Sequence, residues 1–318
     1  MTSEHDSPLF VGVDAGGTKT AAWVGDHETI DGLDIRAISE AIGGSANPRV
    51  VGFQPAADTI GEVIHQALND VANDSEGTNQ RLARICVAAA GAGRHEEQET
   101  LKGMLQKRFP NTRIRVVDDA LPVLAAASES ITGIALIAGT GSFAWGRNRH
   151  GESGRVGGWG PIIGDPGSGY AIALAGLDAV ARAIDRRIPP TSMLDAFCHE
   201  LNLSIPSQII DRIYDPAMTR RDIAGLSKIV FRAAELGDSS ATKILDHAVS
   251  ELVVHVSSLA NRLKLQRGST LAMTGGILVH QRRLREQLLA ALHLFDLKPV
   301  VVMNPVAGSL RLAARGSE

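Results

Sequence analysis

The sequence predicts a two-lobed α/β protein, and three observations lead to this prediction. The chain has 318 residues, which is longer than one ordinary domain and long enough for two cores. Apolar, strand-like segments alternate with segments of helical period, as in proteins built on a partly parallel sheet. A turn rich in glycine and hydroxyl residues follows a strand twice, at residues 14–20 and 139–142. We expect each lobe to carry one such turn.

The composition is that of an ordinary globular enzyme and excludes several classes of protein. Hydrophobic residues make up 44% of the chain and charged residues 21%, and 33 glycines beside 4% aromatics indicate many tight turns. The formal charge of −3 provides no basic field, so we expect no nucleic acid partner. No apolar stretch approaches the roughly 20 residues of a membrane helix, so we expect no membrane partner either.

Cysteine usage and the N-terminal residues predict a cytoplasmic protein. Cys86 and Cys198 are the two cysteines of the chain, and they cannot build a disulfide framework or a cysteine-rich metal site. Residues 1–6 include two acids and no apolar segment typical of a signal peptide.

In the first lobe, predicted as residues 1–118, strands alternate with helices. A sheet begins with strands at residues 9–14, 20–24 and 35–42. Apolar residues of period 3.6 predict a helix at 55–74, which the polar run 73–80 ends. The remaining predicted elements are a buried strand at 83–90 that ends on the glycines 91 and 93, a helix with Leu101, Met104, Leu105 and Phe109 inward, and a strand at 113–117.

The second lobe, predicted as residues 119–303, begins with a strand at 134–138 and becomes mostly helical. The glycine-rich stretch 151–169 shows neither helical nor strand period, which predicts a functional loop. The clearest helices are expected at 171–184 and 240–265, and strands return at 270–274 and 299–303. Residues 304–318 are predicted to form a helix that packs back on the first lobe.

The first glycine turn suits the phosphates of a nucleotide. Gly16 and Gly17 let the backbone approach closely, Thr18 and Thr20 add hydroxyl donors, and Asp14 can hold a hydrated cation. A Walker A loop is excluded because Thr18 stands where that motif requires lysine. Because a similar turn recurs at residues 139–142, a phosphate-binding hairpin is favoured over a plain β-turn, and Lys19 is interpreted as solvated.

The second glycine turn has two interpretations. Gly139, Thr140, Gly141 and Ser142, continued by Phe143 and Ala144, match the dinucleotide fingerprint. That fingerprint should open a helix, whereas residues 143–146 continue as a strand-like segment. A second phosphate hairpin is therefore favoured.

Three aspartates are candidates for chemistry. Asp118 and Asp119 follow a strand, and one of them can accept a proton from an attacking hydroxyl. Because adjacent side chains of an extended segment point in opposite directions, only one can act, and the other is expected to form a turn or cap. Asp165 fits an Asx-turn or a sugar-hydroxyl acceptor equally well. His150, His280 and the arginines 282, 283 and 285 are interpreted as solvated surface residues.

Four motifs together resemble the N-acetylglucosamine and glucosamine kinase branch of the BadF-type ATPase family, within the actin-like ATPase and sugar kinase superfamily. They are Asp14–Thr20, Gly139–Ser142, the stretch Gly157-Gly158-Trp159-Gly160 running into Gly164–Tyr170, and Thr274-Gly275-Gly276.

The resemblance implies an actin-like, ribonuclease H-like fold with a cleft between the lobes, and an ATP- and Mg²⁺-dependent kinase of an amino sugar that acts on its 6-hydroxyl. Asp119 would be the base, and Asp14 would position Mg²⁺ through water. The two hairpins would hold the phosphates of ATP, and Gly275 and Gly276 its adenosine. The amino sugar would be held by Asn47, Asp119, Gly158, Trp159 and Asp165. Family members are often dimers, which leaves a homodimer open.

Departures from the family pattern leave the substrate open. Phe143 stands where relatives often have asparagine or a small residue, and Pro166 replaces a glutamate, so glucosamine and N-acetylglucosamine are both candidates. The zinc-binding cysteines of the ROK family are absent. Two alternatives are an iron–sulfur ATPase activator, which would need closely placed cysteines, and a non-catalytic sugar sensor.

Overall fold

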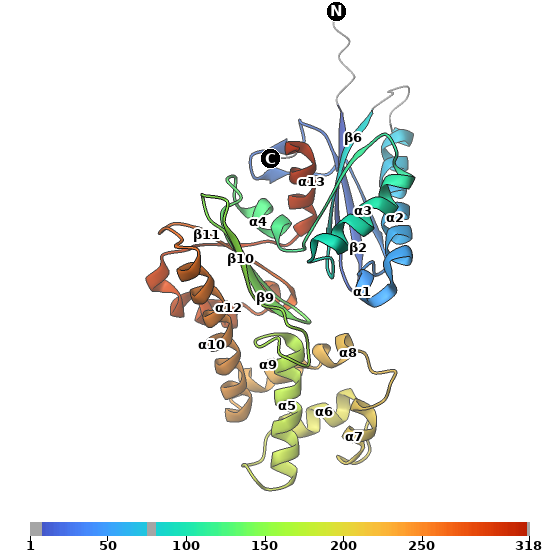
Figure 1. Cartoon of the computed structure of the whole chain (residues 1–318). Helices are drawn as coiled ribbons and strands as arrows, with labels where there is room; N and C mark the ends of the chain where they lie inside the picture. Colours follow the sequence, from blue (N-terminus) through green and yellow to red (C-terminus); the bar gives the residue numbers. More distant parts are fainter. Residues whose placement is uncertain (1–7, 75–80, 317–318) are drawn as a thin grey trace, which may run out of the picture. The chain divides into compact units, whose positions relative to one another are not determined.

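The computed structural model describes residues 8–74 and 81–316, which form two compact units (Figure 1). One unit comprises Met1–Gly133 together with Val302–Glu318, and the other comprises Ile134–Val301. The boundary thus lies later in the chain than residue 118. Part of the predicted helix stop, residues 75–80, falls outside the described residues.

The first unit is built on a five-stranded sheet with the order β5-β2-β1-β6-β7. β1 pairs antiparallel with β2 and parallel with β6, and β7 continues the parallel side. The strands of the sheet are β1 (Leu9–Ala15), β2 (Thr20–Gly25), β5 (Ser39–Gly43), β6 (Leu82–Ala89) and β7 (Arg113–Val117), and a separate small hairpin consists of β3 (Ile30–Asp31) and β4 (Asp34–Ile35). β1 is buried along nearly its whole length because helices cover both faces of the sheet.

Helices α2 and α3 cover one face of this sheet, and α13 lies on the other (Figure 1). The helices of the unit are α1 (Pro48–Val51), α2 (Phe53–Asp74), α3 (His95–Arg108), α4 (Leu121–Ala127) and α13 (Pro305–Arg315). α13 packs directly on β1, where a Cβ on Gly12 would overlap the backbone of Leu310. Glycine at this position allows the C-terminal helix to lie close against the central strand.

The second unit repeats the strand order of the first, β10-β9-β8-β11-β12. In each sheet the strands follow the order third, second, first, fourth, fifth along the chain, so β8 occupies the place of β1. The strands are β8 (Gly133–Ala138), β9 (Ser142–Arg147), β10 (Ser153–Gly157), β11 (Thr270–Thr274) and β12 (Lys298–Val301). The glycine turn after the first strand of each sheet is therefore a repeated feature of the fold.

The helices of the second unit enclose a separate apolar core centred on α5, α9 and α10. They are α5 (Gly169–Ile184), α6 (Met193–Glu200), α7 (Gln208–Ile213), α8 (Arg220–Gly225), α9 (Ser227–Glu235), α10 (Ser239–Arg262), α11 (Gly276–His280), α12 (Arg282–Ala291) and the short 3₁₀ helix His293–Phe295. Among the described residues, no helix combines the length and apolarity needed to cross a membrane.

Two predicted elements were wrong. The single strand at 35–42 is divided into β4 and β5, because the N–H of Arg36 donates to Thr29 and that of Ile38 to Val24, which bends the chain between them. The stretch 151–169 is not all loop, since it contains β10, paired with β9. Its strand period is hidden because Gly154 and Gly157 stand where side chains would meet Arg262 and His255 of α10.

Candidate active site

The first glycine turn joins β1 to β2 as a closed hairpin. The N–H of Gly16 donates to the carbonyl of Lys19 at 3.0 Å. Gly17 and Thr18 are exposed at its tip. The hairpin therefore presents its backbone and the Thr18 hydroxyl outward, as an anion site requires.

Thr20 is the buried end of this hairpin. Its hydroxyl donates to the carbonyl of Gly44 at 2.8 Å, and its side chain is fully buried. Because a hydroxyl carries one proton, Thr20 cannot also donate to a phosphate in this arrangement. It instead fastens the hairpin to the loop that leads to Asn47, which leaves Thr18 as the hydroxyl available to a ligand.

Asp14 lies near the carboxyl end of β1. Burial raises the pKa of its carboxyl to about 6, and the charge of Lys19 opposes part of that rise. Among the described residues, no group of three histidine, cysteine or acidic side chains could hold a metal. A single carboxylate nevertheless fits Mg²⁺, which keeps several waters and binds substrate phosphates. A divalent cation would also relieve the cost of this buried charge.

Asn47 lies where three predicted parts of the site meet. It is the N-cap of α1, and its Oδ1 accepts the N–H of Arg49 at 2.9 Å. A Cβ on Gly91 would overlap that same Oδ1, and one on Gly17 would lie 3.8 Å from Nδ2. The structure thus brings together the loop that carries Asn47, the glycine turn after β6 and the first glycine hairpin.

Asp118 and Asp119 have separate roles in the structure. Oδ1 of Asp118 accepts the N–H groups of Ala120 and Leu121, each at 2.9 Å, and so caps the start of α4. This is the turn-forming role that we expected for one of the pair. Asp119 is half-buried and engages in interactions of its own.

Strand register places Asp14 and Asp119 at the same edge of the sheet. Asp14 pairs with Ala88 of β6, and Ala88 pairs with Val117 of β7. Since strands lie about 4.8 Å apart, the ends of β1 and β7 are separated by about 10 Å. The carboxyl ends of parallel strands are where ligands bind in such sheets.

The second glycine turn joins β8 to β9 and contacts the predicted adenosine turn. The N–H of Gly139 donates to the carbonyl of Gly141 at 2.9 Å. A Cβ on Gly139 would lie 3.6 Å from the nitrogen of Gly276, and one on Gly275 would overlap the carbonyl of Ala138. Gly275 also has a φ of 93°. This close packing brings the second hairpin and the Gly275–Gly276 turn together.

Ser142 plays the part in the second hairpin that Thr20 plays in the first. Its buried hydroxyl donates to the carbonyl of Pro166 at 2.6 Å. Thr140 is half-buried beside it. Pro166 lacks a backbone donor, but its carbonyl ties the hairpin to the loop that carries Asp165.

Asp165 is buried and holds its loop together. Oδ1 accepts the N–H of Gly160 at 3.1 Å, and Oδ2 forms an ion pair with Arg220. Trp159, in the same loop, leaves 72% of its surface exposed. The Oδ1 of Asp165 thus accepts the N–H of a residue five positions earlier in the chain, and not that of residue 167 as an Asx-turn requires. The sugar-acceptor role stays a prediction, because each carboxylate oxygen can accept a further hydrogen bond.

Gly158 and Phe143 lie beside a cationic side chain. The guanidinium of Arg155 stacks on the ring of Phe143 at 3.9 Å, and a Cβ on Gly158 would overlap it. Phe143 is buried, which removes its ring from ready contact with a substrate.

The sequence matches the BadF/BadG/BcrA/BcrD ATPase family over residues 11–292. The chain belongs to this family. The match spans both glycine hairpins, Asp119 and the Gly275–Gly276 turn.

Three relatives cover most of the chain. An N-acetylmuramic acid/N-acetylglucosamine kinase of Clostridium acetobutylicum is 32% identical over 266 residues, 84% of each chain. An N-acetyl-D-glucosamine kinase of Dictyostelium discoideum is 30% identical, over 84% of this chain and 85% of its own. The glucosamine kinase GspK of Vibrio cholerae is 26% identical, over 80% and 81%.

Solved structures confirm the fold of this BadF/BadG/BcrA/BcrD family member. A protein from Chromobacterium violaceum superposes with a TM-score of 0.75 at 20% identity, over 96% of this chain and 98% of its own. A likeness at this identity concerns the fold alone, which is that of actin-like ATPases and sugar kinases, as predicted.

Sequence reasoning missed two residues that contact the candidate site of this family member. Arg220 contacts Asp165 from 55 positions away, and His255 of α10 packs against Gly157. Of the two, only His255 could have been found from the sequence, because it lies on the buried face of a long amphipathic helix. Its Nδ1 bonds the carbonyl of Glu251 at 2.7 Å.

The cysteines offer no support for an iron–sulfur role. Cys86 is buried in β6, where burial raises the pKa of its thiol to about 12. Cys198 is half-buried in α6. A buried thiol with a raised pKa is a poor source of the thiolate that a cluster requires.

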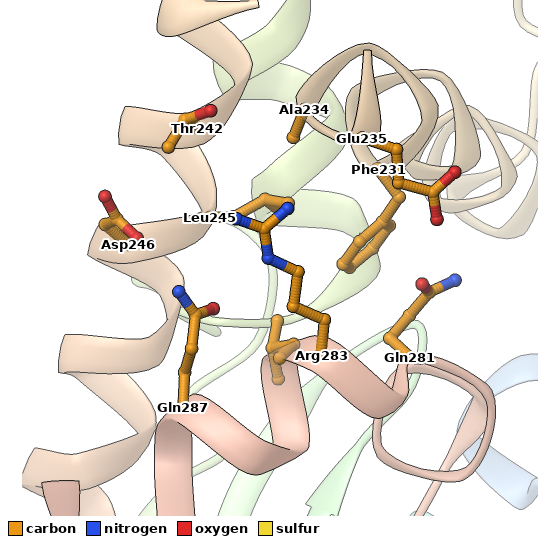
Figure 2. Close-up of a pocket in the computed structure, with 10 residues that line it drawn as sticks. Phe231, Ala234, Glu235, Thr242, Leu245, Asp246, Gln281, Arg283 and Gln287 are labelled. Carbon is orange, nitrogen blue, oxygen red and sulfur yellow. The ribbon is translucent and has the colours of Figure 1, made fainter. Parts of the chain in front are cut away.

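Two cavities of the second unit differ in their relation to the predicted site. One of about 540 Å³ is lined by Trp159, Asp165 and the histidines 247 and 255. The other, of about 40 Å³, has room for only a few waters. Figure 2 shows Arg283 reaching into the smaller cavity between α9, α10 and α12, and no predicted site residue lines that cavity.

The arginines of α12 were predicted to be solvated, which holds for Arg282 and Arg283. Arg285 differs, since its Nη1 donates to the carbonyls of Leu278 and Val279 and so caps α11. His150 and His280 are exposed, as predicted.

Proposed function

We propose that this protein is an ATP- and Mg²⁺-dependent kinase that phosphorylates the 6-hydroxyl of an amino sugar. The observation that carries the proposal is that each glycine hairpin is fastened by a buried hydroxyl to the loop bearing a predicted sugar residue. Thr20 bonds the loop before Asn47, and Ser142 bonds the loop that carries Asp165. Phosphate and sugar groups would thereby be held by parts fixed to one another, as phosphoryl transfer demands.

Asp119 would act as the base. It accepts the proton of the 6-hydroxyl while that oxygen bonds to the γ-phosphorus and the bond to the β–γ bridging oxygen breaks, giving a sugar 6-phosphate and ADP. The capping bonds of Asp118 support this assignment, because they leave Asp119 as the acid of the pair for chemistry.

Asp14 would hold Mg²⁺ through water, and the exposed Thr18 and the hairpin N–H groups would bind phosphate oxygens. Bound Mg²⁺ supplies positive charge that offsets the charge of the phosphates. Gly139, Thr140 and Gly141 of the second hairpin would also bind phosphate oxygens. Gly275 and Gly276 would lie against the adenosine.

Asn47, Gly158, Trp159 and Asp165 would bind the sugar. We expect N-acetylglucosamine to be the better acceptor and glucosamine the alternative, because the names of the relatives at 32% and 30% identity both include N-acetylglucosamine. The homodimer and the cytoplasmic location stay predictions.

The test is ADP release with Mg-ATP and a panel of sugars comprising N-acetylglucosamine, glucosamine, glucose and N-acetylmuramic acid. We expect an amino sugar to stimulate turnover, and Asp119→Asn to lower kcat by about 10² to 10⁴. Asp118→Asn is the matched control, since asparagine can still cap α4 and should keep most activity. The proposal fails if no sugar raises turnover above the level of Asp119→Asn.

A further inference from the structure

Arg220 brings a positive charge to the second glycine hairpin. A Cβ on Gly141 would lie 2.9 Å from Nη2 of Arg220 and 2.9 Å from Oδ2 of Asp165, so both side chains abut this turn. Residues 139–142 themselves carry no charged side chain. The start of α8, which is distant in the sequence, therefore places a positively charged side chain beside the turn that is predicted to bind the phosphates of ATP.

The guanidinium is held in place but not saturated with acceptors. Nη2 pairs with the buried carboxylate of Asp165, and the group lies 5.6 Å from the ring centre of Tyr170. Nε is buried without a hydrogen-bond partner. The protein groups therefore supply this guanidinium with fewer acceptors than its five N–H donors can bond, and the guanidinium can donate further hydrogen bonds to a ligand.

Phosphate is the acceptor that best fits this position. A guanidinium has five N–H donors in a planar fork that matches phosphate oxygens, and cationic clamps stabilise the charge of a transferring phosphoryl group. The Arg220 side chain is 38% exposed, so it can reach a ligand.

We propose, on the basis of the kinase function above, that Arg220 is a phosphate-binding residue of this site. Its guanidinium binds the outer phosphates of the nucleotide, and Asp165 is the positioning residue that aims it. Asp165 thus links its own loop, which carries the predicted sugar residues Gly158 and Trp159, to the second glycine hairpin.

The experiment measures affinity for Mg-AMPPNP, a non-hydrolysable ATP analogue, and for AMP, which lacks the outer phosphates. We expect Arg220→Gln to weaken Mg-AMPPNP binding by about tenfold to a hundredfold, the effect of losing a charge-assisted hydrogen bond, and to leave AMP binding within about twofold. Arg221→Gln removes the same charge from the adjacent, exposed residue and should change neither affinity. Arg220→Lys should recover part of the loss, because it keeps the charge without the fork.

Thermal unfolding first establishes that each variant is folded, and Arg220→Lys carries the comparison if Arg220→Gln is not. The inference is overturned if Arg220→Gln binds Mg-AMPPNP as well as Arg221→Gln does, or loses AMP affinity equally. These measurements need no sugar. A wild-type protein that phosphorylates no sugar would therefore refute the kinase function, while the binding comparison would still decide the role of Arg220.

Discussion

The hydroxyl of Ser142 donates a 2.6 Å hydrogen bond to the carbonyl of Pro166, which joins the second glycine hairpin to the loop of Asp165. Thr20 makes the equivalent bond to Gly44 in the other unit. Both hydroxyls stand at the first residue of the second hairpin strand, and both are buried. The two units therefore use the same device to fix a glycine hairpin against a neighbouring loop.

Thr20→Val should uncouple the first hairpin from its loop. Valine has the shape of threonine but no hydroxyl, so Gly44 loses its donor, at a cost of about 1 kcal/mol in the free energy of unfolding. We expect kcat/KM for the sugar to fall by about fivefold, which is the effect of an equal cost in the transition state. Steady-state kinetics and urea unfolding measure the two effects. Thr20→Ser keeps the hydroxyl and should stay close to wild type; equal losses in both variants would contradict this account.

Asp14 should make the protein less stable as pH rises from about 4 to about 6. Its pKa is about 6 in the folded state against 3.8 as the ordinary value, so the folded state binds more protons in that range. Asp14→Asn should therefore stabilise the protein at pH 7 by about 1 to 3 kcal/mol and have little effect below pH 4. Unfolding midpoints across this pH range measure the difference.

Mg²⁺ provides the control for Asp14. A nearby divalent cation favours the charged carboxylate, so Mg-ADP should raise the unfolding temperature of wild type more than that of Asp14→Asn. If Mg-ADP raised the unfolding temperature of both proteins equally, Asp14 would not be a ligand-sphere residue of the metal.

Much of the fold could be predicted from the sequence because apolar periodicity reflects local geometry. The strands at 113–117 and 270–274 have the predicted bounds, and the helix predicted at 55–74 begins only two residues earlier, at Phe53. Glycine-rich β10 could not be found this way, since its pairing depends on backbone bonds to β9 and not on side-chain alternation.

The direction of individual side chains at the site could not be predicted. Thr18 and Thr20 look alike in the sequence, but strand register turns Thr20 inward and leaves Thr18 exposed at the tip. From the sequence pattern alone, only one of Asp118 and Asp119 could act as the base, but which one was not determined. The hydrogen bonds to the start of α4 identify Asp118 as the capping residue. Arg220 meets Asp165 through the tertiary fold alone, which no local spacing reveals.

Arg311 should be the arginine of α13 on which stability depends. It is 1% exposed, and its Nη1 donates to the carbonyls of Ala125 and Ser128 at 2.6 and 3.1 Å, which caps the end of α4. Arg311→Met keeps an unbranched apolar stem but leaves both carbonyls without this donor, and we expect a loss of about 2 kcal/mol in the free energy of unfolding. Arg315→Met, in the exposed last turn, should cost less than about 1 kcal/mol. Urea unfolding of the two variants checks this, and equal losses would contradict it.

Gly275 should tolerate no side chain, whereas Gly276 should. A Cβ on Gly275 would overlap the carbonyl of Ala138 at a φ of 93°, so Gly275→Ala must displace the turn from the second hairpin. We expect a loss of about 2 kcal/mol or more in the free energy of unfolding, together with weaker Mg-ADP binding. A Cβ on Gly276 meets nothing within 4 Å, and this position begins α11, so Gly276→Ala should leave stability unchanged or slightly raised. Thermal unfolding and nucleotide titration compare the two variants; a Gly275→Ala protein as stable as Gly276→Ala would show that the close contact with Ala138 is not needed.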